Sequence, residues 1–184
     1  MFLIAGRQLL SREGIEVLVI ALEPEHALYS SPAGGHSAKE LVHRGLDAGG
    51  IVVLPWGFGK WLGSRGRLVR GLADSVELKS HPLFFLGDIL ARCWPWPTPR
   101  VFRSQRVLPG TDILPLPGFE ARLASYGFRI RGDFSAGAPS GSLLAMLRRR
   151  TPIESVGGRD SMLETAGNQV RYRVRGLGRA QKSG

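Results

Sequence analysis

The 184 residues are 43% hydrophobic and 22% charged, which excludes an intrinsically disordered chain and is enough for one hydrophobic core. The formal net charge of +10 attracts anions such as nucleic acid, phosphorylated ligands or membrane surfaces, although a solvated arginine-rich surface gives the same count. No run reaches the roughly 18 consecutive apolar residues of a transmembrane helix. We therefore expect no membrane partner and a cytoplasmic location.

Two apolar strands open the predicted fold. They cover residues 2–5 and residues 15–22, and the polar residues 6–14 connect them as a hairpin or as neighbours in one sheet. A core strand so close to the first residue predicts that the usual N-terminal elements of the fold are missing. An exposed sheet edge would then remain, at which two copies of the chain could pair as a homo-oligomer.

Helices and buried strands alternate in the next part of the chain. Ser37 and Glu40 have the spacing of a capping box, which predicts a helix over residues 38–48. The apolar run Ile51–Pro55 follows a Gly-Gly pair and reads as a strand buried on both faces. The later elements are a helix over residues 67–73 and strands over residues 83–86 and 107–108.

This alternation predicts an α/β fold with a mainly parallel sheet. The C-terminal part adds weaker elements: short helices over residues 119–126 and 142–150, a strand over residues 128–130, and a helix over residues 161–175. We expect residues 1–150 to form the α/β domain and residues 151–184 to form a C-terminal helix and a basic tail. In such folds, ligands bind at the carboxyl ends of the strands.

The loop after the strand Ile51–Pro55 has the residues of a pocket rim. Its sequence WGFGKW combines aromatic walls, beginning with Trp56, with two glycines and the cation Lys60. Together with Arg65 and Arg67, these residues predict a phosphate-binding site that needs no metal. Aromatic loop residues also cap the ends of barrels that bind no ligand, so both interpretations stay open.

Two later strands end in a glycine with an aspartate one or two residues further on, namely Asp88 after Gly87 and Asp112 after Gly110. Since the carboxyl ends of parallel strands meet at one edge, both carboxylates could face one mouth and hold a divalent cation. Each aspartate could instead cap the next turn. His81, just before the strand at residues 83–86, is the best histidine candidate for a third metal ligand.

Four stretches carry a resemblance to a known family. They are GRQLLSREGIEVLVI at residues 6–20, GIVVLPWG at residues 50–57, LFFLGD at residues 83–88 and LPGTD at residues 108–112. In this order they resemble the PHP (polymerase and histidinol phosphatase) family of metal-dependent phosphoesterases. The resemblance implies an incomplete or distorted βα barrel-like fold and a hydrolase acting on phosphorylated substrates.

The chain also departs from the family pattern. Gln8 stands where the resemblance implies a glutamate ligand, the opening His-x-His strand is absent, and Ile113 follows Asp112 where a histidine is expected. These departures imply a truncated relative that is impaired or inactive. Its cofactor would be Mn, Zn or Mg, and the absence of a cofactor is an equal expectation.

The alternative function is a non-enzymatic basic module that binds nucleic acid or phosphorylated ligands. The cluster Arg148-Arg149-Arg150 and the arginines after Glu164 support it, because no acidic residue follows Glu164. This alternative predicts one contiguous basic face and salt-sensitive binding. Whether the protein is an enzyme is left open by the sequence.

Overall fold

The computed structural model describes residues 1–57, 59–93, 96–112 and 116–180. Its main sheet has five strands in the order β1 (Gly6–Leu10), β2 (Glu16–Ile20), β3 (Ile51–Pro55), β4 (Phe84–Ile89) and β5 (Val107–Gly110). The pairs β1–β2 and β2–β3 are antiparallel, while β3–β4 and β4–β5 are parallel. The expectation of a barrel-like fold with a mainly parallel sheet is therefore wrong: the sheet is mixed, and the described strands form no closed barrel.

The antiparallel start of the sheet follows from a short turn. The Ser11 amide donates to the Ile15 carbonyl at 2.9 Å, and a connection this short can only join antiparallel strands. The first strand was predicted at residues 2–5, but it lies at Gly6–Leu10, in the stretch expected to be a connection. Polar Arg7 and Gln8 fit a strand there because β1 is an edge strand and both residues are exposed.

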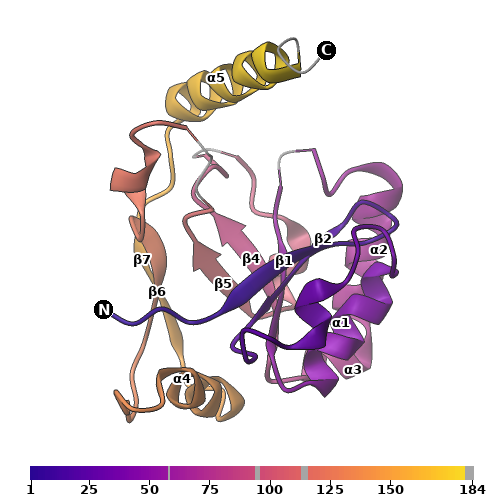
Figure 1. The fold of residues 1–184 in the computed structure, drawn as a ribbon, viewed down its shortest axis with the longest axis vertical. Helices are drawn as coiled ribbons and strands as arrows, with labels where there is room; N and C mark the ends of the chain where they lie inside the picture. Colours follow the sequence, from indigo (N-terminus) through magenta and orange to yellow (C-terminus); the bar gives the residue numbers. More distant parts are fainter. Residues whose placement is uncertain (58, 94–95, 113–115, 181–184) are drawn as a thin grey trace.

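Three helices lie together on one side of the main sheet: α1 (Ala38–Asp47), α2 (Gly63–Asp74) and α3 (Val76–Ser80) (Figure 1). The predicted capping box of α1 is confirmed, with the Glu40 amide donating to Ser37 Oγ at 3.2 Å and the Ser37 amide donating to Glu40 Oε2 at 2.6 Å. Gly45 lets α1 approach the sheet, because a Cβ there would lie 2.7 Å from Val52 Cγ2.

The second half of the chain adds a small antiparallel sheet. It consists of β6 (Tyr126–Ile130) and β7 (Ile153–Gly157), with α4 (Pro139–Arg148) between them in sequence. Figure 1 shows these elements on the side of the main sheet opposite α1, and α5 (Met162–Ala180) set apart beyond the strands. The strand β7 was not predicted, and it pairs with β6 across the expected boundary at residue 150.

Three short 3₁₀ turns complete the described elements: η1 (Ala27–Ser30), η2 (Arg100–Arg103) and η3 (Phe119–Arg122). The central strands β3 and β4 are buried along their whole length, as predicted for β3. Because these strands run parallel to β5, the loops that leave all three emerge at the same edge of the sheet. Within the described residues, no helix is both long and apolar enough to cross a membrane.

Candidate ligand site at the carboxyl edge of the sheet

A cavity of about 580 Å³ opens at the carboxyl edge of β3 and β4. Its walls come from the loop after β3, from α2, and from the proline-rich segment together with the start of η2. We call it the tryptophan–arginine pocket, after the lining residues Trp56, Trp61, Arg70, Trp96 and Arg100. Its volume lies in the range of about 300–1,000 Å³ that is typical of small-molecule sites.

Aromatic rings pack against one another in the wall of this pocket. Trp56 is buried and contacts Trp96 edge to face, with ring centroids 6.1 Å apart. Trp61 packs perpendicular to Phe102 at 5.8 Å. Gly66 on α2 is needed for this arrangement, because a Cβ at this position would overlap the carbonyl oxygen of Trp61. The pocket wall is therefore held by ring packing and by one close backbone approach.

Two cations line the same cavity from different elements. Arg70 lies on α2, four residues after Gly66, and Arg100 begins η2. Both side chains are exposed, and neither forms an ion pair with any residue that the structure describes. Their charges are therefore available to an anionic ligand.

Asp88, predicted as a metal ligand, is instead buried in a hydrogen-bonded cluster. Arg92 Nε and Nη2 donate to Asp88 Oδ1 and Oδ2, both at 2.5 Å, and the Tyr126 hydroxyl donates to Oδ2 at 2.9 Å. Burial, followed by the negative charge of Asp88, raises the pKa of Tyr126 to about 12. We call this cluster of Asp88, Arg92 and Tyr126 the buried tie, because it joins β4 to β6.

The buried tie also supports the pocket. Arg92 Nη1 donates to the carbonyl oxygen of Trp96 at 3.4 Å, and the Trp96 amide donates to the Cys93 carbonyl at 2.7 Å. The guanidinium carbon of Arg92 lies 5.5 Å from the ring centroid of Phe102. The backbone of Trp96 is thus hydrogen-bonded to two buried residues, Arg92 and Cys93.

Asp112 belongs to a separate group of charges, with Lys60 and Glu16. Lys60 Nζ forms an ion pair with Glu16, so this predicted phosphate ligand is already neutralised within the protein. Asp112 adopts a left-handed backbone with φ of 46°. Its surroundings desolvate the carboxyl and Glu16 repels its charge; together these effects raise the pKa of Asp112, against the attraction of Lys60.

The remaining predicted site residues lie elsewhere. His81 precedes β4 at the opposite edge of the sheet, where its Nδ1 accepts from the Leu83 amide at 3.2 Å and burial lowers its pKa. Arg65 lies beside Gly14 and Arg67 is exposed on α2, and neither lines the pocket. Of the predicted phosphate-binding residues, only Trp56 lines it.

The three predicted metal ligands are therefore not brought together. Asp88 is buried in the tie, Asp112 lies beside Lys60 and Glu16, and His81 lies at the other edge. In the described part of the chain, no group of three histidine, cysteine, aspartate or glutamate side chains could hold a metal ion. Asp88 instead joins β4 to β6 through Arg92 and Tyr126.

The predicted basic face would require the cluster Arg148-Arg149-Arg150 and the C-terminal arginines to lie together. Arg148 and Arg150 donate to the carbonyls of Gly49 and Ser80, near α4, while Figure 1 places α5 at the opposite end of the molecule. The side chains of the arginines after Tyr172 lie outside the described residues. The described backbone thus places α4 and α5 apart, and the contiguous basic face stays a prediction.

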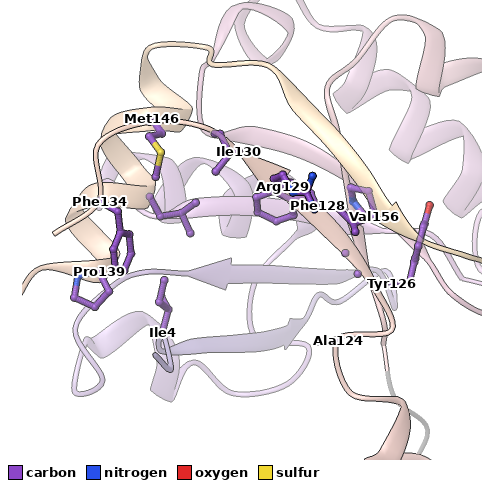
Figure 2. A pocket seen from close by; sticks show the side chains of 15 residues that line it. Ile4, Ala124, Tyr126, Phe128, Arg129, Ile130, Phe134, Pro139, Met146 and Val156 are labelled. Atoms are coloured by element: carbon purple, nitrogen blue, oxygen red, sulfur yellow. The ribbon is translucent and has the colours of Figure 1, made fainter. Parts of the chain in front are cut away.

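A second cavity, of about 770 Å³, lies between the N-terminal segment, the small sheet and α4. Figure 2 shows that apolar side chains dominate it, among them Ile4, Phe134 and Met146. Its one charged lining residue, Arg129, lies 3.9 Å from Glu154. The lining residues that the structure describes are mostly apolar, so we base no functional proposal on this cavity.

Arg70, Trp96 and Arg100 are the site residues that sequence reasoning missed. Trp96 and Arg100 lie in or just after the proline-rich segment predicted only as a bend, and Arg70 lies inside the predicted helix. Comparisons with protein-family models, curated proteins and solved structures found no match.

Proposed function

We propose that this protein is a binding module for phosphorylated ligands and that the tryptophan–arginine pocket is its site. One observation carries the proposal: Arg70 and Arg100 line the same cavity without an ion pair to a described residue, whereas Arg92 is paired with Asp88 and Lys60 with Glu16. Guanidinium groups bind phosphate in a bidentate manner, and the hydrogen bonds are strong because both partners are charged.

The surroundings of the two arginines favour anion binding. The tryptophan walls place apolar surface beside the two cations, and a lower local dielectric strengthens charge–charge contacts. The net charge of +10 raises the concentration of anions near the whole surface. A phosphorylated small molecule is the kind of ligand that fits these conditions and the size of the cavity.

Nothing in the described geometry assigns a catalytic step to this site. Asp88, the acidic group nearest to the pocket segment in sequence, accepts hydrogen bonds from both Arg92 and Tyr126. The function of a metal-dependent phosphoesterase stays a prediction. Binding of a phosphorylated ligand needs only the two arginines and the aromatic walls, so we propose it in preference to phosphoesterase activity.

Calorimetric titration with inorganic pyrophosphate, a minimal phosphorylated probe, tests the proposal. We expect saturable binding, and a loss of about 10-fold to 100-fold in affinity in Arg70→Ala and in Arg100→Ala, since a charged hydrogen bond contributes ~1.5–3 kcal/mol. Arg67→Ala is the matched control, because Arg67 is exposed on the same helix but does not line the cavity.

Two results would overturn the proposal. One is the absence of binding at low ionic strength, where contacts between exposed charges are least screened. The other is equal binding by the wild type, the two pocket variants and Arg67→Ala, which would place the anion site elsewhere on the basic surface.

A further inference from the structure

We infer that this protein has a second binding site, at which Arg106, Arg148 and Arg150 contact the phosphodiester backbone of a nucleic-acid duplex. We call these three residues the amino-edge cluster, because they lie where the parallel strands β3, β4 and β5 begin. None of the three lines either cavity, so the inference does not rest on the proposed function. None forms an ion pair with a residue that the structure describes.

Two of these arginines bind the short segment that precedes β4. Arg106 Nη1 donates to the Pro82 carbonyl at 2.7 Å and to the Leu147 carbonyl, near the end of α4, at 3.1 Å. Arg150 Nη2 donates to the carbonyl of Ser80, two residues before Pro82. Because the two guanidinium groups bind carbonyls this close in sequence, they lie near each other at the start of β4.

Arg148 brings a third guanidinium group to the same edge. Its Nη2 donates to the carbonyl of Gly49 at 3.4 Å, two residues before β3 begins. Burial lowers the pKa of His81, which lies before β4, and the charge of Arg148 adds to that effect. Glu77 and Asp47 oppose it, yet no ion pair joins either of them to a described arginine.

The charge of Arg106 has no described acidic partner. Its guanidinium carbon lies 4.6 Å from the ring centroid of Phe85, and its Nη2 is buried without a hydrogen-bond partner among the described residues. Burial, followed by the neighbouring charge of Arg150, lowers the pKa of Arg106. An anion bound at the cluster would offset this repulsion, because a nearby opposite charge favours the charged form.

Helix capping explains part of this arrangement. The three arginines bind carbonyls near or just beyond the C-terminal ends of α1, α3 and α4, where cations are favourable. That role occupies one N–H group of Arg148 and one of Arg150, whereas a guanidinium group has several more. Both side chains are exposed, so their other donors can reach the phosphates of a ligand.

The surroundings of the cluster favour a duplex as the ligand. None of the exposed large hydrophobic residues that the structure describes lies in residues 47–50, 80–82, 106 or 147–150. These segments therefore offer neither the apolar side chains that insert into a membrane nor an aromatic ring on which a single strand could stack. A duplex presents its phosphates outward, and arginines bind them without reading the base sequence.

Fluorescence anisotropy of the full chain with a labelled DNA duplex of about 20 base pairs tests the inference. We expect binding that does not depend on sequence and that weakens as the salt concentration rises, because counterions leave the phosphates. Arg148→Gln and Arg150→Gln should each reduce the slope of log K against log salt concentration by about 0.9, the value for one phosphate contact. An RNA duplex of the same length should behave alike, since both sources present the same backbone phosphates.

Arg7→Gln is the matched control, because it removes the same charge from β1, at the opposite edge of the sheet from β5. A loss in this control equal to that in the cluster variants would overturn the inference, since net charge alone would then cause it. The absence of duplex binding at low ionic strength would also overturn it.

Two further comparisons separate the cluster from other sites and ligands. Arg70→Ala should leave duplex binding unchanged, and a loss there equal to that of the cluster variants would place the duplex at the tryptophan–arginine pocket instead. Tighter binding of a single strand, or of vesicles that contain anionic lipids, would overturn the duplex as the ligand.

Discussion

Arg92 and Arg70 lie at the same end of the main sheet, but only Arg92 forms an ion pair with a residue that the structure describes. Arg92 is 3% exposed and meets Asp88 through two hydrogen bonds of 2.5 Å. Arg70 is exposed at the cavity and meets no described acidic group. The difference separates two uses of the same side chain: a buried and neutralised guanidinium holds segments together, and an open one is available to a ligand.

Alanine substitution of each arginine should give the largest difference in the free energy of unfolding. We expect Arg92→Ala to lower the free energy of unfolding by about 3–5 kcal/mol, because Asp88 would be left buried without its cation. Arg70→Ala should change it by no more than about 0.5 kcal/mol. Urea denaturation measures both values, and similar losses in the two variants would contradict the distinction.

A smaller effect is expected at the third member of the buried tie. Tyr126→Phe removes the hydroxyl that donates to Asp88 Oδ2 at 2.9 Å, while both hydrogen bonds from Arg92 remain. We expect a loss of about 1.5 kcal/mol in the free energy of unfolding, at the low end of values for hydrogen bonds to charged groups. Tyr172→Phe on α5 is the matched control and should leave urea denaturation unchanged.

The smallest effect concerns Asp112, whose carboxyl has a raised pKa. The folded state then binds its proton more tightly than the unfolded state does, so this group favours folding at low pH. That contribution is lost as the pH rises from about 3.8 through the raised value.

We therefore expect the stability of Asp112→Asn, relative to the wild type, to increase with pH across this window and to level off above it. Asparagine suits the test, because it tolerates the positive φ found at this position. Urea denaturation of both proteins at several pH values measures the trend. A difference that is constant with pH would contradict the assigned role of desolvation and of Glu16.

Local signals predicted the parts of the fold that depend on nearby residues. The strand Ile51–Pro55 is confirmed because its apolar residues suit burial on both faces, and the helix start at Ser37 is confirmed because its cap involves only Glu40, three residues away. The first strand was misplaced, since an exposed edge tolerates the polar Arg7 and Gln8. The strand β7 was missed because most of its residues are exposed and carry no apolar pattern.

Strand direction and the candidate site could not be predicted in the same way. The antiparallel pairing of β2 with β3 is set by how the chain returns after α1, which no local pattern encodes. Lys60 was expected to bind phosphate, but its partner Glu16 lies 44 residues away in sequence. Trp56 follows its strand directly and lines the cavity, whereas Arg70 and Arg100 reach the same cavity only after the chain has folded.

The hydrogen bond from Arg92 to Trp96 connects the pocket to the junction of the two sheets, and we expect the two to be energetically coupled. Arg92 contacts the Trp96 backbone on one side and Asp88 on the other, and Asp88 in turn accepts from Tyr126 of β6. A ligand that binds in the pocket should therefore slow amide hydrogen exchange in β6 as well as in the segment around Trp96. By reciprocity, any change that loosens the small sheet should weaken ligand affinity by the same coupling free energy.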